Sequence, residues 1–207
     1  MQDASWSTWF CDLKGNDILV HINEEFINDD FNLTGLNQII PKYKDVLSMI
    51  RDTDTDLDSE DYQELNKYAT SLYYLIHQRY IISKKGLADM ADRFNAGDFG
   101  KCPRFLCNQS NLLPIGLHES LGKSSVKLFC PKCQEVYYPS SKYAKIDGAA
   151  FGPSFPSLLL LSVQNLKLNT GPLLKYVPRI FGIKVHQSVF MPENEVENEK
   201  GGSAMQQ

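Results

Sequence analysis

The first hundred residues carry apolar side chains at helical spacing. The clearest helix is predicted over residues 59–82, and its apolar stripe consists of Leu65, Ala69, Leu72, Ile76 and Tyr80. Four further segments have the same character: residues 5–15, 24–31, 42–51 and 85–94. Ser5 is placed to cap the first of these segments, and Gly97 is placed to end the last. The pattern predicts an all-α N-terminal domain.

The pattern changes at Cys102. Short runs at 126–129 and 135–138 are typical of strands, and prolines and glycines separate them from their neighbours. We therefore predict a small antiparallel sheet in this part of the chain.

Four of the five cysteines form two short pairs. Four residues separate Cys102 from Cys107. Two residues separate Cys130 from Cys133, and twenty-two lie between the pairs. Two such knuckles supply the four soft ligands that Zn²⁺ binds in a tetrahedron. We predict one structural Zn²⁺ ion per chain, because four thiolates leave no open coordination position for catalysis. The predicted fold class is therefore α+β: an all-α N-terminal domain, a small zinc-ribbon β domain and an extended C-terminal segment.

Two other interpretations of these cysteines stay open. Disulfide pairing is one, but no hydrophobic signal core is found at the N-terminus, so we expect a reducing compartment. The expected localisation is cytoplasmic and nuclear. Chance burial is the other, and it explains one pair more readily than two. The fifth cysteine, Cys11, lies among aromatic residues and is interpreted as a buried thiol.

Charge divides the chain where the hydrophobic pattern does. Residues 1–100 carry 9 basic and 18 acidic side chains, a net of −9, whereas residues 101–207 carry 12 and 7, a net of +5. The predicted regions are an α-helical domain at 1–100, a zinc ribbon at 101–160, a C-terminal segment at 161–190 and a disordered tail at 191–207. The longest apolar run, residues 158–163, is far too short to span a bilayer, so no membrane association is predicted.

The ribbon carries more apolar side chains than a unit of about fifty residues buries on its own. We therefore predict that it associates with a second copy of the chain and forms a homodimer. The predicted interface residues are Pro103, Phe105, Leu113, Val136 and Tyr137.

Six acids lie close together before the long helix: Asp52, Asp54, Asp56, Asp58, Glu60 and Asp61. One interpretation is a solvated loop with a helix start, and the other is a docking patch for polyamines or basic proteins. A calcium loop fits less well, because the central glycine and the closing glutamate are missing.

Residues 176–186 alternate apolar side chains around Gly182, which is placed to turn the chain. An edge strand of the chain's own domain and a docking element both fit this pattern. In a docking element Phe181 and Ile183 would be the anchors. We find no glycine-rich phosphate loop, nucleophile elbow or kinase catalytic motif, so no catalytic residue is predicted. His77, in the long helix, is interpreted as a packed histidine.

A series of ordered motifs runs through residues 5–187. In sequence order they are Ser5-Trp6, Trp9-Phe10-Cys11, Phe31-Asn32-Leu33-Thr34-Gly35-Leu36-Asn37, Leu75-Ile76-His77, Arg79-Tyr80-Ile81, Gly97-Asp98-Phe99-Gly100, Cys102-Pro103-Arg104, Leu113-Pro114-Ile115-Gly116-Leu117, Val126-Lys127-Leu128, Cys130-Pro131-Lys132-Cys133, Asp147-Gly148-Ala149, Phe151-Gly152, Phe155-Pro156 and Val177-Pro178-Arg179. With these motifs the chain closely resembles the regulatory beta subunit family of casein kinase II.

The resemblance implies a non-catalytic regulator of a Ser/Thr protein kinase. It implies a dimer joined through the zinc ribbons that binds two catalytic subunits, stabilises them and alters which substrates they phosphorylate. It places the acidic regulatory loop, associated with polyamines or basic substrates, on residues 52–61. It places the catalytic-subunit docking element on Arg179, Phe181, Gly182, Ile183, Lys184, Val185 and His186.

Three features depart from the family pattern. Residues 1–4 replace the N-terminal serine–glutamate cluster that serves as an autophosphorylation site. At the docking element the usual tyrosine and phenylalanine are Phe181 and Ile183, so one ring and its contact area are lost. The basic, histidine-rich stretch after the second knuckle is thinned to residues 142–145.

Two other classes of function compete with this interpretation. A nucleic-acid-binding zinc ribbon has support from the basic residues between 101 and 145. The acidic first half would repel nucleic acid, so we do not predict it as a partner. A zinc hydrolase needs an open metal position, which four cysteines do not leave.

Overall fold

The computed structural model describes residues 5–53, 59–172, 174, 176–186 and 189, without the side chains of residues 59–61. Three features predicted from the sequence lie outside this part: the tail 191–207, the acids Asp54, Asp56 and Asp58, and the side chains of Glu60 and Asp61. The chain forms two compact units, Met1–Gly171 and Pro172–Gln207, and each is described by itself. The boundaries predicted near residues 100, 160 and 190 stay predictions.

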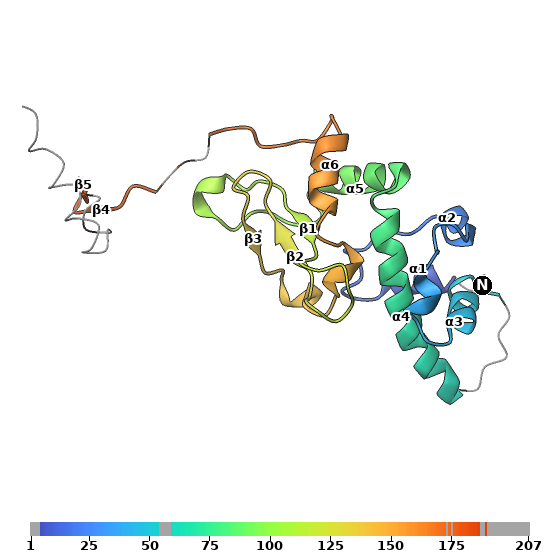
Figure 1. Ribbon diagram of the computed structural model, residues 1–207. Helices are drawn as coiled ribbons and strands as arrows, with labels where there is room; N and C mark the ends of the chain where they lie inside the picture. The colour runs from blue at the N-terminus through green and yellow to red at the C-terminus, as the bar shows by residue number, and fades with distance from the viewer. Residues whose placement is uncertain (1–4, 54–58, 173, 175, 187–188, 190–207) are drawn as a thin grey trace, which may run out of the picture. The chain divides into compact units, whose positions relative to one another are not determined.

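The described residues before Gly97 are mainly helical, as predicted (Figure 1). The helices are α1 (Trp6–Asp12), α2 (Glu24–Asn28), the 3₁₀ helix η1 (Leu36–Gln38), α3 (Tyr43–Ile50), α4 (Ser59–Tyr80) and α5 (Lys84–Ala96). Ser5 Oγ accepts a hydrogen bond from the Thr8 N–H and caps α1, while Ser83 caps α5 in the same way. Gly97 ends α5 in the left-handed conformation, with φ of 84°.

Helix α4 forms the centre of this part of the molecule. Helix α3 packs along it, and the predicted stripe is buried, with Ala69, Leu72 and Ile76 fully enclosed. Tyr73 and Tyr80 of the same helix are buried as well. The hydrophobic period therefore predicted which face of α4 points into the core. Among the described helices, none is both long enough and apolar enough to cross a membrane.

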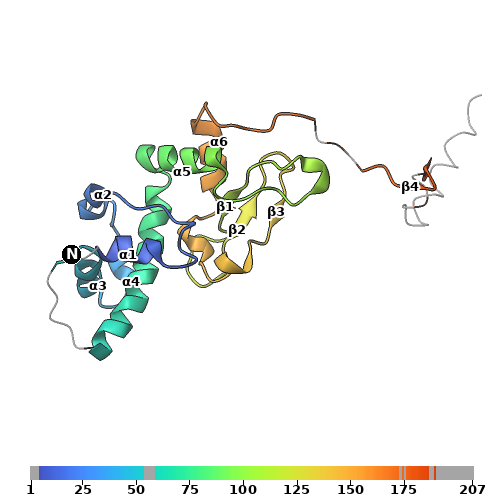
Figure 2. The same ribbon diagram turned by 180° about the vertical axis from the view of Figure 1, so that it is seen from behind.

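The ribbon is a three-stranded antiparallel sheet in the order β1-β2-β3, visible from both sides in Figures 1 and 2. Its elements are η2 (Phe105–Cys107), β1 (Leu113–Ile115), β2 (Lys127–Phe129), β3 (Val136–Tyr137), η3 (Ser141–Tyr143) and η4 (Gly148–Ala150). Leu113 pairs with Phe129, and Phe129 pairs with Val136. Helix α6 (Phe155–Ser162), which the sequence did not predict, packs against β1.

The helical part and the ribbon share one hydrophobic core. His77 on α4 connects them directly. Its Nε2 accepts a hydrogen bond from the Val20 N–H at 3.1 Å, and its Nδ1 lies 2.6 Å from the Ala150 carbonyl oxygen. Arg93 on α5 donates to the carbonyl oxygens of Ile18 and Leu19, which belong to the segment between α1 and α2. His77 thus fastens the ribbon to the helices by a buried polar contact in addition to packing, and Arg93 fixes the segment between α1 and α2 within the helical part.

The second unit contains a short hairpin. Strands β4 (Arg179–Ile180) and β5 (Ile183–Lys184) pair antiparallel, with Ile180 opposite Ile183. Phe181 and Gly182 turn the chain at φ of 48° and 83°, the two positive values typical of a tight hairpin turn. Within the described residues these two strands pair only with each other.

Candidate metal centre and docking surfaces

Two loops of the ribbon carry the four cysteines. Cys102 follows an isolated bridge between Lys101 and Asn111, and its N–H donates to the Ser110 carbonyl. Cys107 ends η2. The second loop joins β2 to β3, so the ends of these two adjacent strands position both cysteines of that knuckle.

In the second knuckle the backbone turns sharply between Cys130 and Cys133. The Cys130 N–H donates to the Glu135 carbonyl, and the Gln134 N–H donates to the Cys130 carbonyl. Gln134 adopts a left-handed conformation with φ of 59°. This tight turn brings the two thiols of a two-residue spacing to one side of the loop.

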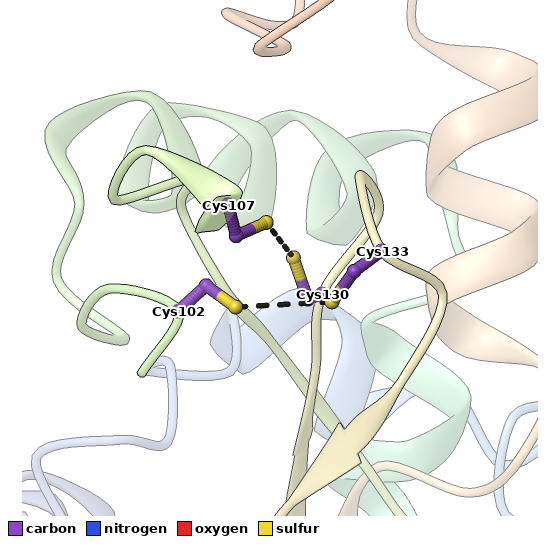
Figure 3. Close-up of side chains that lie close together, drawn as sticks. All are labelled: Cys102, Cys107, Cys130 and Cys133. Carbon is purple, nitrogen blue, oxygen red and sulfur yellow. Dashed lines mark hydrogen bonds between the residues drawn. The ribbon is translucent and has the colours of Figure 1, made fainter. Parts of the chain in front are cut away.

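The four sulfur atoms converge on one point (Figure 3). Cys107 Sγ lies 3.5 Å from Cys130 Sγ, and Cys102 Sγ lies 3.8 Å from Cys133 Sγ. All four lie within 4.8 Å of one another. A tetrahedron with Zn–S bonds of about 2.3 Å has sulfurs about 3.8 Å apart, so the cluster fits this ion closely. All five cysteines are free thiols, and the closest pair is well beyond the ~2.05 Å of a disulfide bond.

Burial makes four thiolates difficult to hold here without a cation. Burial raises the pKa of Cys107, and the neighbouring Cys130 adds to the effect. Burial also raises the pKa of Cys130, although the backbone N–H groups of the knuckle oppose it. A divalent cation at the centre would let all four sulfurs ionise, because it compensates their mutual repulsion. The donor set of sulfur alone, enclosed from solvent, favours zinc over harder ions.

Tyr137 contributes a contact that the cysteine spacing did not indicate. Its hydroxyl lies 3.2 Å from Cys133 Sγ. Burial acts to raise the pKa of Cys133, but the hydrogen bond from Tyr137 and that from the Glu135 N–H outweigh it and lower the pKa to about 7. Tyr137 thereby stabilises the thiolate form of one metal ligand. No local sequence signal links a tyrosine in a strand to a particular cysteine.

The predicted dimer interface residues are placed unevenly. Phe105 is 93 % exposed and Val136 is 44 % exposed, Pro103 is also exposed, and Tyr137 is partly buried. Leu113 is fully buried in β1, so the structure places it in the core of the ribbon and leaves no side-chain surface for a partner. Alternation in the sequence could not predict the burial of Leu113, because β1 has only three residues and two of them, Leu113 and Pro114, are buried.

The hairpin of the second unit carries the predicted docking residues. Phe181 has a completely exposed side chain, and Ile180 and Ile183 are 61 % and 75 % exposed. Arg179 Nη1 donates to the Gly182 carbonyl oxygen across the turn, and the Val185 N–H donates to the Pro178 carbonyl oxygen. Lys184 is exposed on β5, Val185 after it is partly buried, and His186 is exposed. The turn is closed by its own hydrogen bonds and presents its apolar side chains to solvent.

Of the acidic run, only the first residue can be described fully. Asp52 has a positive φ of 52°, and its carboxylate accepts a hydrogen bond from the Trp6 N–H at 2.8 Å. This contact ties the end of α3 to the start of α1. The interpretation of the remaining acids stays a prediction.

Two interpretations of single residues are confirmed. Cys11 is buried, with its sulfur 3.1 Å from the Tyr73 hydroxyl, and burial raises its pKa to about 11. A thiol with such a pKa is inert. His77 has no exposed surface and is a packed histidine.

Comparison with known proteins agrees with the motifs. The family model for the casein kinase II regulatory subunit matches residues 5–184. The chain is 42 % identical over 201 residues to casein kinase II subunit beta of Dictyostelium discoideum, covering 96 % of this chain and 75 % of that protein. It is 44 % identical over 204 residues to casein kinase II subunit beta of Schizosaccharomyces pombe, covering 97 % and 88 %. It is 37 % identical over 200 residues to casein kinase II subunit beta' of Drosophila melanogaster, covering 95 % and 91 %.

Proposed function

Because the chain belongs to the casein kinase II regulatory subunit family, we propose that it is a non-catalytic, zinc-dependent homodimer that binds two catalytic subunits. In this role it stabilises them and changes which substrates they phosphorylate. The observation that carries the proposal is the cluster of four buried cysteines, which can hold one structural Zn²⁺ per chain. Its ligand set supplies folding energy and leaves no coordination position for a reaction.

The proposed dimer depends on the metal through β3. This strand begins three residues after Cys133 and consists of Val136 and Tyr137. The hydroxyl of Tyr137 contacts the Cys133 sulfur, so a bound ion would orient one of the proposed interface residues. Phe105 lies within the other knuckle, as the first residue of η2, which ends at Cys107. The proposed face therefore consists of side chains whose backbone the metal holds.

The proposed contact with the catalytic subunit is the hairpin of the second unit. Its turn is preorganised by hydrogen bonds, so little chain entropy is lost on binding. Phe181 and Ile183, if fully buried in a complex, would each contribute about 2–3 kcal/mol. The acidic run at 52–61 is proposed to attract polyamines or basic substrates, and the chain is proposed to act in the cytoplasm and nucleus.

The experiment combines size-exclusion chromatography with light scattering and zinc analysis, with and without a casein kinase II catalytic subunit. We expect one zinc per chain, a dimer mass for the chain alone and a complex with two catalytic subunits. Replacing both anchors, Phe181→Ala with Ile183→Ala, should abolish the complex and leave the dimer intact. The matched control replaces two exposed isoleucines of the helical part, Ile39→Ala with Ile82→Ala, and should bind normally.

Two results would contradict the proposal. A zinc-free, monomeric protein at micromolar concentration would exclude the metal-dependent dimer. A complex that survives loss of Phe181 and Ile183 would place the docking site elsewhere on the chain.

A further inference from the structure

The last segment of the first unit contacts the two loops that carry the metal-binding cysteines. Residues 163–171, which we call the strap, follow α6 and end this unit. Val163, Leu166 and Asn169 of the strap are partly buried, whereas the residues between them are exposed. Val163 and Leu166 pack against the shared core. The third inward position holds a polar side chain, so hydrogen bonds have to account for its burial.

Asn169 bridges the two knuckles. Its Oδ1 accepts a hydrogen bond from Lys132 Nζ at 2.8 Å, and Lys132 lies inside the second knuckle. Its Nδ2 donates to the Asn108 carbonyl oxygen at 3.2 Å, and Asn108 directly follows Cys107, the last ligand of the first knuckle. One amide side chain on the strap therefore holds a residue from each metal-binding loop.

The backbone of the strap is itself held in place. Asn95, in the last turn of α5, donates from Nδ2 to the Asn165 carbonyl oxygen at 3.3 Å and accepts at Oδ1 from the Lys167 N–H at 2.7 Å. The Gly171 N–H donates to Asn169 Oδ1 at 3.3 Å. The amide of Asn169 is thus presented to the knuckles from a fixed chain, and a preorganised group loses little entropy when it makes its contacts.

We propose that Asn169 is a positioning residue of the metal site. It locks the two knuckles together from outside and fixes the ammonium group of Lys132. Four thiolates carry more negative charge than one Zn²⁺ neutralises, so a cation held in the second knuckle favours the loaded site. Because such coupling is reciprocal, the bound ion in turn holds the strap, from which the chain continues to the docking hairpin. The inference rests on the zinc site of the proposed function.

The test measures the transfer of zinc from the full-length chain to a chromogenic chelator. We expect Asn169→Ala to lower the zinc affinity about tenfold, because it removes hydrogen bonds that form only when both knuckles are in place. The matched control is Asn165→Ala on the same strap. Asn165 has an exposed side chain and contributes its backbone carbonyl to the contact with Asn95, so this variant should keep the affinity of the parent.

Lys132→Met removes the same contact from the other side. In this background Asn169→Ala should lower the zinc affinity only about threefold, because the hydrogen bond to Asn108 is the one left to lose. A general loss of packing would give the same factor in both backgrounds. Bound Co²⁺ should keep the absorption spectrum of a tetrahedral thiolate site in each variant, because the ligands are unchanged.

Hydrogen exchange of the zinc-loaded protein tests the reciprocal effect. In Asn169→Ala the strap should lose protection while β1–β3 keep theirs. Equal zinc affinities of the parent and Asn169→Ala would overturn the inference, as would equal losses in Asn169→Ala and Asn165→Ala or the same factor in both backgrounds. A parent chain that binds no zinc would overturn the metal site together with this inference, so the two failures are distinguishable. Circular dichroism of the zinc-loaded variants establishes that each is folded.

Discussion

Two hydrogen bonds hold the neutral His77 ring in one tautomer. Nε2 accepts from Val20, so Nδ1 carries the proton and donates to Ala150. Burial lowers the pKa of His77 from 6.5 to about 4. The unfolded chain therefore binds a proton at higher pH than the folded chain does. The stability that neutral His77 contributes is complete above pH 6.5 and is lost as the pH falls towards 4.

This predicts a specific pH dependence. Between pH 7 and pH 5, His77 should lower the free energy of unfolding by about 2 kcal/mol. In His77→Gln the amide can replace both hydrogen bonds but does not titrate, so this part of the pH dependence should disappear. Urea unfolding at both pH values, with zinc content measured, provides the test. His21→Gln, at an exposed position, is the control and should keep the full dependence. An unchanged slope in His77→Gln would contradict the assignment.

The hydroxyl group of Tyr137 is expected to affect the affinity for zinc. Tyr137→Phe removes only the hydroxyl that lies against Cys133 Sγ. Because groups that orient a metal ligand typically change affinity 10–100-fold, we expect zinc affinity to fall at least about tenfold. Competition with a chromogenic chelator measures this change. Tyr138→Phe makes the same substitution one residue later, at an 86 % exposed side chain, and should leave the affinity unchanged. Equal affinities in the two variants would exclude a role for the Tyr137 hydroxyl.

The junction of α4 and α5 is closed around a glycine. Gly86 lies in the first turn of α5, and a Cβ atom built there would overlap the Tyr80 carbonyl oxygen. In an exposed helix Gly→Ala stabilises by about 1 kcal/mol, because glycine loses more backbone entropy on folding. Here the overlap is with backbone, which cannot rotate away.

We therefore expect Gly86→Ala to destabilise the protein by about 2 kcal/mol or more, the reverse of the propensity effect. Thermal unfolding of the variant gives the sign. Ala88→Gly, at an exposed position of the same helix, calibrates the propensity and should lose about 1 kcal/mol. A Gly86→Ala variant that is more stable than the parent would show that the two helices can separate without loss.

The elements differ in how well the sequence predicted them, for identifiable reasons. Helices α4 and α5 carry long apolar periods and end signals such as Gly97, so local information was sufficient. Helix α6 was missed because Leu158, Leu159, Leu160 and Leu161 are consecutive, and a continuous apolar run has no helical period to detect. Strand β1 was missed because it has three residues with a proline in the middle.

The sequence likewise predicted only part of the candidate metal centre. The cysteine spacing predicted which thiols would meet, because the geometry of a knuckle is local. The contacts that fasten the centre to the rest of the chain join distant positions. His77 and Ala150 are 73 residues apart, and Lys142 and Asp17 are 125 apart. Such pairs have no periodic signature, so one sequence alone could not indicate them.

The shared core makes the whole first unit dependent on the metal site. The helices and the ribbon bury one continuous set of apolar side chains, and His77 links them through its buried hydrogen bonds to Val20 and Ala150. A structural zinc of this type contributes on the order of 10 kcal/mol. A domain of this size has a total stability of about 5–15 kcal/mol. Loss of the ion should therefore unfold more than the ribbon.

We expect chelation of the native protein to remove hydrogen-exchange protection from α4 as well as from β1–β3, in one cooperative step. Mass spectrometry of exchanged peptides follows both regions, and light scattering on the same samples follows the proposed dimer. Residues 179–184 belong to the other unit and provide the internal control, since their exchange should not respond to the chelator. Restoring zinc should restore protection in α4 and the ribbon together. If α4 kept its protection while the ribbon lost it, the buried contacts of His77 would not couple the two parts, and the helical half would be an independent folding unit.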